Sequence, residues 1–460
     1  MSLIKSISGI RGTIGGKVND NLTPLDVVKF ASAFGTWLQN TQNKKNLTLV
    51  IGRDARISGE MVSSLVTATL QGLGINVVDL GLSTTPTVEI MVPELKADGG
   101  IILTASHNPK QWNALKLLNG KGEFISGENG AEVLALAENE DFNYAEVDDL
   151  GKYETRNDAF DIHIQQILDL PMVDVEAIKA KKFKIVLDAV NSTGGIAIPM
   201  LLDKLGCETV KLYCEPNGQF PHNPEPLKEH LGDICELVKK ENADLGIVVD
   251  PDVDRLALID EKGEMFGEEY TLVAVADYLL KHKKGTAVSN LSSSRALRDV
   301  ARNHDSEYFA SAVGEVNVVN LMKEKNAVIG GEGNGGIIYP DLHYGRDSLV
   351  GAALFLTHLS KENKTVSQLR AGYPEYFMGK KKIELTPEIN VDDILAKMEK
   401  EYQNEEVSTV DGVKIDFEKN WVHLRKSNTE PIIRIYTEAH SQEEADKLGD
   451  DIIAKIKSLI

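Results

Sequence analysis

Short apolar runs alternate with longer segments of helical periodicity along the first three quarters of the chain. Residues 24–40 and 59–73 repeat apolar side chains every three or four positions, which predicts helices. The apolar runs are rich in Val, Ile and Leu, which predicts buried strands of parallel or mixed sheets covered by helices. The expected strands are 47–51, 75–80, 101–103, 184–187, 245–249 and 327–329.

The pattern changes near residues 370–382, where a turn-prone Ala-Gly-Tyr-Pro precedes a basic patch. Beyond it we expect strands at 382–385, 413–417, 421–424 and 432–437, with a helix at 391–402. A last helix begins after Ser441, and Glu444 three residues later completes a capping box. Together these elements predict a compact C-terminal α+β domain at 371–460.

Two further changes suggest domain boundaries. Residues 138–149 contain six acids and no base, which is typical of a solvated connector. A turn signal, Asp-Glu-Lys-Gly, follows the apolar run that ends at Ile259. A chain of 460 residues is long enough for about three or four domains. We therefore expect four, at 1–152, 153–258, 259–370 and 371–460.

Composition narrows the class of protein. With 42% hydrophobic and 26% charged residues, the chain has the composition of a folded globular protein. A net charge of −20 disfavours nucleic acid and anionic membranes as partners. The spacing of Cys207, Cys214 and Cys235 fits neither a zinc site nor a disulfide framework. Because the sequence also shows no signal peptide and no membrane-spanning stretch, we expect a cytoplasmic protein.

A candidate nucleophile follows the expected strand that ends at Leu103. The run Thr-Ala-Ser-His-Asn-Pro places Ser106 beside His107 at the end of a strand, and Lys116 follows. A serine hydroxyl needs a nearby base or cation to react, so this turn suits a phosphoryl carrier. The alternative is a capping serine with a structural histidine.

A candidate metal site follows the expected strand 245–249. Asp250, Asp252 and Asp254 lie at alternate positions and repel one another unless a cation holds them, which suits oxygen ligation of Mg²⁺. Arg255 next to them could bind a phosphate oxygen. An EF-hand is disfavoured because position 6 of such a loop would be Arg255, where the turn needs glycine. The remaining alternative is an acidic, solvated loop.

Two later loops could bind a ligand. The glycine-rich run 330–336 carries Glu332 and Asn334, whose side chains suit sugar hydroxyls. The run 425–431 carries Arg425, Ser427, Asn428 and Thr429, which together suit an oxyanion. Near the N-terminus, Arg11 stands between glycine-containing segments. Each loop taken alone is also compatible with an ordinary surface turn.

Together and in this order, these segments resemble the α-D-phosphohexomutase superfamily, which includes phosphoglucomutases, phosphomannomutases and phosphoglucosamine mutases. The resemblance runs from Arg11 to Pro431. It implies three related α/β domains and a C-terminal α+β domain around a central cleft. It also implies a phosphoserine loop in 1–152, a metal loop in 153–258, a sugar-selecting loop in 259–370 and a phosphate-binding loop in 371–460.

The resemblance assigns roles to the candidate residues. Ser106 is similar to the active-site phosphoserine, with Arg11, His107, Lys116 and Arg255 around it. The implied Mg²⁺ ligands are Ser106, Asp250, Asp252 and Asp254. Glu332 and Asn334 match the sugar-selecting loop, and the distal phosphate would be bound by Arg425, Ser427, Asn428 and Thr429. Either His107 or Lys116 is the expected general acid or base.

The implied reaction interconverts hexose 6-phosphate and hexose 1-phosphate through a hexose 1,6-bisphosphate, which also serves as activator. Asn334 and Gly336 stand where many members have Ser and His, and Gly314-Glu315 replaces a usual Gly-His pair. In both respects the chain resembles the archaeal-type relatives of the phosphoglucosamine mutases, and this resemblance favours glucosamine phosphate over mannose or glucose phosphate. A cytoplasmic monomer or homodimer is expected. The competing hypotheses are a phosphatase with an aspartate nucleophile and a non-catalytic phosphosugar-binding protein.

Overall fold

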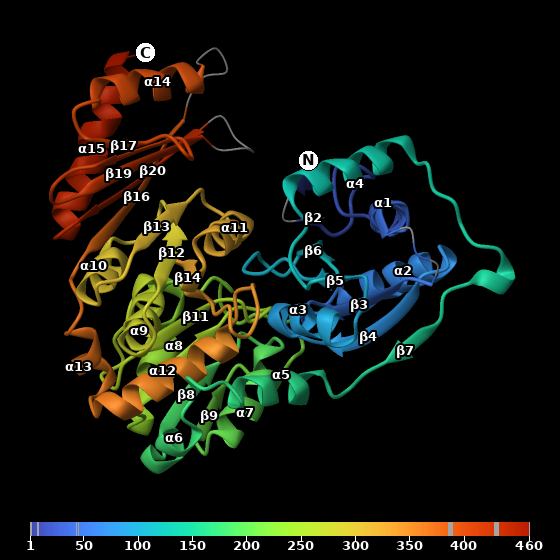
Figure 1. The fold of residues 1–460 in the computed structure, drawn as a ribbon, viewed down its shortest axis with the longest axis horizontal. Coiled ribbons are helices and arrows are strands. Elements are labelled where there is room, and N and C mark those ends of the chain that lie inside the picture. The colour runs from blue at the N-terminus through green and yellow to red at the C-terminus, as the bar shows by residue number, and fades with distance from the viewer. Residues whose placement is uncertain are drawn as a thin grey trace. The chain divides into compact units, whose positions relative to one another are not determined.

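A computed structural model describes residues 2–6, 9–42, 44, 46–384, 390–426 and 432–459. The chain divides into two compact units (Figure 1). The first unit comprises residues 1–271 and 334–369, and the second comprises 272–333 and 370–460. The chain therefore passes from one unit to the other three times.

The N-terminal part of the first unit is a seven-stranded mixed sheet. Its order is β1 (Ile4–Ser6), β2 (Gly9–Thr13), β6 (Trp112–Asn119), β5 (Gly99–Leu103), β3 (Thr48–Arg53), β4 (Asn76–Leu82) and β7 (Tyr153–Thr155). Strands β5, β3, β4 and β7 are parallel, whereas β6, β2 and β1 continue the sheet through antiparallel pairs. The mixed sheet predicted from the apolar runs is confirmed.

Helices cover both faces of this sheet (Figure 1). An apolar core between the sheet and α1 (Pro24–Gln42), α2 (Gly59–Gly72) and α4 (Gly127–Asn139) includes Phe34, Val66 and Val133. A second core lies under α3 (Thr85–Glu94), which starts at the N-cap residue Thr84 and has proline in its first turn. Strand β5 is buried along its whole length, so the loop that follows it begins inside the protein.

The rest of the first unit is built on a four-stranded sheet. Its order is β11 (Leu256–Ile259), β10 (Leu245–Val249), β8 (Lys184–Asp188) and β9 (Glu208–Leu212). Only the β10–β11 pair is antiparallel. The helices here are α5 (Ala159–Leu168), α6 (Val175–Lys181), α7 (Gly194–Lys204), α8 (Gly232–Glu241), α12 (Ser348–Glu362) and α13 (Val366–Arg370), and residues 336–338 form β15 (Gly336–Ile338).

The second unit contains two sheets. Parallel strands β13 (Tyr308–Ser311), β12 (Thr286–Asn290) and β14 (Ala327–Glu332) accompany α10 (Ala296–Asn303) and α11 (Glu315–Lys325). Helix α9 (Glu268–His282) crosses from one unit into the other. The second sheet is antiparallel, in the order β16 (Phe377–Glu384), β20 (Ile432–Ala439), β19 (Trp421–Lys426), β18 (Val413–Asp416) and β17 (Glu406–Ser408).

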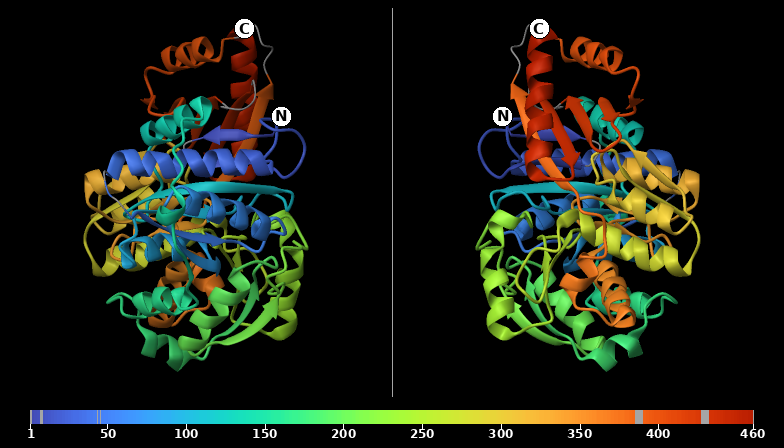
Figure 2. Two further views of the ribbon diagram at one scale, coloured as in Figure 1. Left: turned by 90° about the vertical axis from the view of Figure 1, so that its right-hand side faces the viewer. Right: turned by 90° about the vertical axis from the view of Figure 1, so that its left-hand side faces the viewer.

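Helices α14 (Val391–Glu401) and α15 (Gln442–Leu459) complete this C-terminal sheet, and α15, red in Figure 2, runs along it. The predicted N-cap is present, because Ser441 Oγ accepts a hydrogen bond from Glu444 N at 3.2 Å. Strand β16 begins at Phe377 instead of Lys382, since it pairs with β20 as far as Ala439. The three-residue strand β17 was not predicted.

The candidate loops occupy corresponding places along the chain. Residues 104–111 connect β5 to β6, residues 250–255 connect β10 to β11, and residues 333–335 connect β14 to β15. In each case the loop follows the end of a strand that lies in a parallel pair, which is where α/β sheets place their ligands. Among the described helices, none is long and apolar enough to cross a bilayer, and the cytoplasmic location stays a prediction.

Candidate active site

Ser106 occupies the first turn after the buried strand β5. Its backbone is left-handed, with φ of +47°, and its amide donates to Thr104 Oγ1 at 2.9 Å. This conformation directs the hydroxyl toward the β10–β11 loop, where Ser106 Oγ donates to Asp250 Oδ2 at 2.8 Å. The structure thus brings together two predicted residues that are 144 positions apart in the sequence.

The three predicted metal ligands are buried next to one another. One carboxylate oxygen from each of Asp250, Asp252 and Asp254 lies within 4.8 Å of the others. Asp250 Oδ1 accepts from the amides of Asp254 and Arg255, at 3.1 and 3.2 Å, which curls the loop around it. Within this loop Val253 has φ of +65°, a conformation that is strained for a β-branched residue.

This cluster fits a divalent cation. Among the described residues, Asp252 Oδ1 and Asp254 Oδ1 are buried without a hydrogen-bond donor. Burial, together with the charges of Asp254 and Asp252, raises the pKa of Asp250 well above its usual range. Three close carboxylates without a cation cannot all stay ionised, and carboxylate oxygens are the ligands that Mg²⁺ prefers.

Two cations balance part of this negative charge. Lys116, on β6, places Nζ 2.7 Å from Asp252 Oδ2 and 3.7 Å from Asp254 Oδ2. Burial alone would lower the pKa of Lys116, but the two carboxylates outweigh burial and raise it, so the amine is protonated. Arg346, from the segment before α12, donates through Nη2 to Asp254 Oδ2 at 2.6 Å.

Arg346 was not predicted from the sequence. It belongs to the tripeptide Gly345-Arg346-Asp347, which repeats the Gly-Arg-Asp of residues 52–54. The repeated tripeptide could have drawn attention to Arg346 in the sequence. Asp347 caps α12 by accepting from Leu349 N at 2.8 Å, and this cap fixes the segment that carries Arg346.

His107 and Arg255 lie beside the carboxylates. Burial is the main reason that the pKa of His107 falls to about 2, and the positive charges of Arg255, Arg346 and Lys116 lower it further. The imidazole is therefore neutral in this arrangement. Arg255 Nη1 lies 3.4 Å from Glu225 Oε1, and its Nε lies 3.9 Å from Asp254 Oδ1.

Arg11 is on β2, which pairs with β6. It stands opposite Ala114 in the antiparallel register. Cross-strand partners share one face of a sheet, and so do residues two apart on one strand. Arg11 and Lys116 therefore project from the same face.

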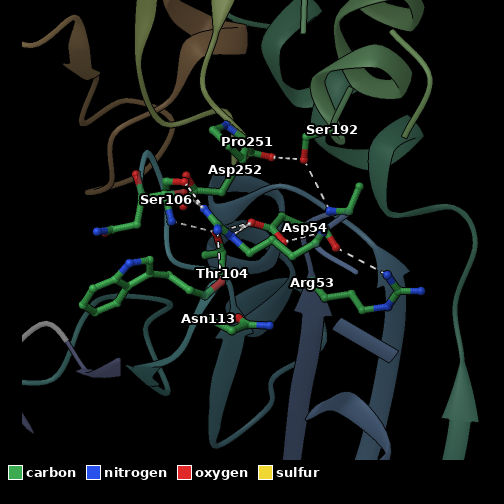
Figure 3. A network of polar contacts seen from close by, with 12 residues as sticks. Arg53, Asp54, Thr104, Ser106, Asn113, Ser192, Pro251 and Asp252 are labelled. Atoms are coloured by element: carbon green, nitrogen blue, oxygen red, sulfur yellow. Dashed lines mark hydrogen bonds and ion pairs between the residues drawn. The ribbon is translucent and has the colours of Figure 1, made fainter. Parts of the chain in front are cut away.

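Thr85 joins α3 to the metal loop. Its amide donates to Asp252 O at 2.9 Å, and its hydroxyl donates to Asp252 Oδ2 at 2.5 Å. On the other side of the loop, Ser192 Oγ donates to Pro251 O at 2.7 Å (Figure 3). These contacts attach the metal loop to α3 and to the loop that follows β8. The sequence offered no sign of either residue.

The other predicted site residues divide between the two units. Glu332, in the second unit, accepts through Oε1 from Asn290 Nδ2 at 2.9 Å and from Gly314 N at 3.2 Å. Asn334, in the first unit, accepts from Gly336 N at 3.2 Å. Arg425 Nε, on β19, forms an ion pair with Asp411 Oδ2 at 2.8 Å. Ser427, Asn428 and Thr429 lie outside the described residues.

Comparison with known families shows the family to which the chain belongs. Four family models described as phosphoglucomutase/phosphomannomutase match the chain in order. Alpha/beta/alpha domains I, II and III match residues 4–144, 161–263 and 267–376, and the C-terminal domain matches 382–455. The chain belongs to the α-D-phosphohexomutase superfamily. The predicted fold class, including its four domains, is confirmed.

Individual relatives agree with this assignment. A "phosphoglucomutase/phosphomannomutase" of Thermococcus kodakarensis is 37% identical over 94% of this chain and 95% of its own length. A "phosphoglucosamine/phosphogalactosamine mutase" of Sulfurisphaera tokodaii is 33% identical over 98% of both chains. The crystal structure of a phosphoglucomutase/phosphomannomutase family protein from Burkholderia thailandensis superposes with a TM-score of 0.85, at 25% identity, over 99% of this chain and 98% of that one.

The phosphohexomutase is therefore an enzyme, an isomerase that moves a phosphoryl group between positions of a hexose phosphate. The names of its relatives include both glucosamine and mannose or glucose phosphates. Its buried aspartate cluster is compatible with a metal ion, as the sequence predicted.

Proposed function

We propose that this phosphohexomutase converts glucosamine 6-phosphate to glucosamine 1-phosphate through a phosphorylated Ser106 and a 1,6-bisphosphate. The hydrogen bond from Ser106 Oγ to Asp250 Oδ2 carries the proposal, because it holds a hydroxyl able to bear the phosphoryl group against the carboxylate cluster. A Mg²⁺ ion held by Asp250, Asp252 and Asp254 would neutralise charge on the transferring phosphoryl group.

The proposed reaction has two balanced transfers. In the first, the bond between Ser106 Oγ and phosphorus breaks as a free sugar hydroxyl bonds to phosphorus. The hydroxyl's proton leaves through a neighbouring base, and Ser106 Oγ takes up a proton. In the second, the other phosphate of the bisphosphate passes to Ser106 Oγ, which gives up its proton, and the sugar oxygen that is released takes up a proton. Lys116 and Arg255 supply positive charge beside both transfers, and the Arg425 loop binds the phosphate that is not reacting.

Two carboxylates favour an amino sugar. Glu315 is the first residue of α11 and is 9% exposed. The amide of its neighbour Gly314 donates to Glu332 Oε1, so Glu315 and Glu332 are held in one place within the second unit. A pair of acids there suits the partly cationic 2-amino group of glucosamine. Phosphomannomutase or phosphoglucomutase activity is the second candidate, on the strength of the Thermococcus relative.

The substrate is tested by comparing kcat/KM on glucosamine, mannose and glucose phosphates, with the matching bisphosphate as activator. The variant Glu315→Gln should lower the preference for glucosamine over glucose phosphate about tenfold, whereas Glu324→Gln, an exposed acid of the same helix, should leave it unchanged. An unchanged preference in Glu315→Gln would remove the role of Glu315.

The phosphoenzyme is tested separately. Peptide mass spectrometry of the active enzyme should find a phosphoryl group on Ser106, and Ser106→Ala should be inactive. An active Ser106→Ala variant would rule out the phosphoserine route. Steady release of inorganic phosphate, without isomerisation, would instead support a phosphatase.

A further inference from the structure

Arg56 is a fully buried arginine in the turn between β3 and α2. Its Nε donates to Asp54 Oδ2 at 2.9 Å. The other four N–H groups donate to backbone carbonyls of the Ser106 turn and of the first residue of β6. They reach Pro109 O at 2.7 Å, Trp112 O at 3.0 Å, Asn108 O at 2.7 Å and Ser106 O itself. A guanidinium has five N–H donors, so every donor of Arg56 is used.

Asp54 also reaches Ser106 by a second route (Figure 3). Thr104 Oγ1 donates to Asp54 Oδ2 at 2.6 Å and accepts from Ser106 N at 2.9 Å. The N–H of Ser106 is thus linked to Asp54 through Thr104, and the C=O of Ser106 is linked to the same carboxylate through Arg56. The two routes together fix both peptide groups that flank the Ser106 α-carbon.

This arrangement counteracts a specific conformational cost. A left-handed serine is uncommon and persists only where the surroundings determine it. A loop that bends back on itself also brings several carbonyls close together inside the protein, where each needs a donor. Arg56 supplies those donors from one rigid, planar group. The ring of Phe220 lies 5.2 Å from its guanidinium carbon and covers one face of that group.

We propose that Arg56, linked to Thr104 through Asp54, is the positioning residue for Ser106 in phosphoryl transfer. It touches no reacting atom. It acts by keeping Ser106 Oγ aligned with Asp250, and a displacement of about 1 Å in such an alignment costs on the order of a hundredfold in rate. This inference rests on the proposed role of Ser106 as the phosphoryl carrier.

The first test replaces Arg56 with lysine, which keeps the charge but cannot donate to four carbonyls in a plane. Transfer from glucose 1,6-bisphosphate to Ser106 is followed in a single turnover by quenched flow and phosphopeptide analysis. We expect Arg56→Lys to slow this transfer about a hundredfold while KM for the hexose phosphate changes little. Arg56→Ala should regain part of the lost rate when guanidinium is added, and not when sodium chloride is added at the same ionic strength.

A control separates positioning from a general loss of stability. Arg295 is another buried arginine, and its guanidinium binds Asp416 and the carbonyls of Phe417, Glu418 and Asn420 in the second unit. The variant Arg295→Lys measures how far Tm falls when a buried arginine that donates to backbone carbonyls is replaced away from the Ser106 turn. The proposal requires Arg56→Lys to slow transfer at least about tenfold more than Arg295→Lys at a similar Tm.

A second pair of variants keeps the test decisive if Arg56→Lys fails to fold. Thr104→Ser retains the hydroxyl that links Asp54 to Ser106 N and should retain the transfer rate. Thr104→Val has nearly the same shape without the hydroxyl and should slow transfer at least about tenfold. Thr69→Val, which removes a buried hydroxyl in α2 that bonds only to its own helix, is the matched control.

The outcomes distinguish this inference from the proposed function. If the unaltered enzyme takes no phosphoryl group at Ser106, the proposed function fails. If the unaltered enzyme is phosphorylated there, and Arg56→Lys or Thr104→Val is phosphorylated at the same rate, the function stands and the positioning role is overturned.

Discussion

Lys116 Nζ lies 2.7 Å from Asp252 Oδ2, and neither side chain is more than 12% exposed. A buried charge whose partner is removed costs about 3–5 kcal/mol, whereas removal of both partners is far less costly. In the presence of a chelator, we therefore expect Lys116→Met to lower the free energy of unfolding by about that amount. The double variant Lys116→Met/Asp252→Asn should regain most of the loss and stay inactive.

Urea unfolding of the four proteins in this double-mutant cycle measures the coupling directly. If the double variant were destabilised by the sum of the two single losses, the coupling would be zero and the ion pair would not stabilise the fold.

Binding of Mg²⁺ to the aspartate cluster should stabilise the folded protein. At a concentration about 100 times Kd, one bound ion adds about 2.7 kcal/mol to the free energy of unfolding. Calorimetry with increasing Mg²⁺ should therefore show a rising Tm that EDTA reverses. Asp254→Asn should lose this response, and Asp203→Asn, an exposed acid on α7, should keep it. A full response in Asp254→Asn would place the ion elsewhere.

Arg425 should contribute to binding more than to the chemical step. The phosphate that it is proposed to hold is bound in both the ground state and the transition state, so its loss raises KM and leaves kcat nearly unchanged. Lysine cannot bind phosphate through two parallel hydrogen bonds, and we expect Arg425→Lys to raise KM about tenfold. The matched control is Arg434→Lys, because Arg434 is exposed and lies opposite Arg425 on β20. A fall in kcat alone would contradict this role.

The pair formed by His222 and Asp188 predicts a pH dependence of stability. His222 Nε2 lies 3.1 Å from Asp188 Oδ2, and the pKa of the imidazole is raised, because the hydrogen bond and charge of Asp188 outweigh the effect of burial. A raised pKa in the folded state stabilises the protein below the unfolded value, near 6.5, and this contribution disappears as the pH rises through the folded value.

Unfolding free energies of the parent protein and of His222→Asn should therefore differ most in mildly acidic solution and converge at alkaline pH. A difference that is independent of pH would show that the imidazole contributes through packing alone.

The sequence predicted the parts of the fold whose signals are local. The runs at 47–51 and 245–249 became β3 and β10 because these strands are buried and have parallel neighbours in mixed sheets, which requires continuous apolar residues. The candidate site followed from the same logic, since the polar residues that could bind a ligand come directly after such strands. Ser106 and Asp250 could be grouped for this reason, and the structure places them in contact.

The residues that the sequence did not indicate bind groups that are distant in the sequence. Arg56 binds carbonyls about fifty positions away, and nothing in its neighbourhood differs from an ordinary turn. Arg346 approaches Asp254 only because the segment before α12 returns to the metal loop. Tertiary contacts of this kind leave no periodic pattern, so hydrophobic spacing could not reveal them. The repeated Gly-Arg-Asp motif could have drawn attention to Arg346, but it does not name Asp254 as the partner.

The left-handed backbone at Ser106 and Val253 has a consequence for engineering. Each such residue costs the folded state on the order of 1–3 kcal/mol, and glycine adopts the same conformation freely. Directed evolution toward heat resistance would therefore be drawn to these two positions. Glycine at 106 removes the hydroxyl, and glycine at 253 loosens the loop between two aspartates. At these positions selection for thermal endurance would act against selection for turnover.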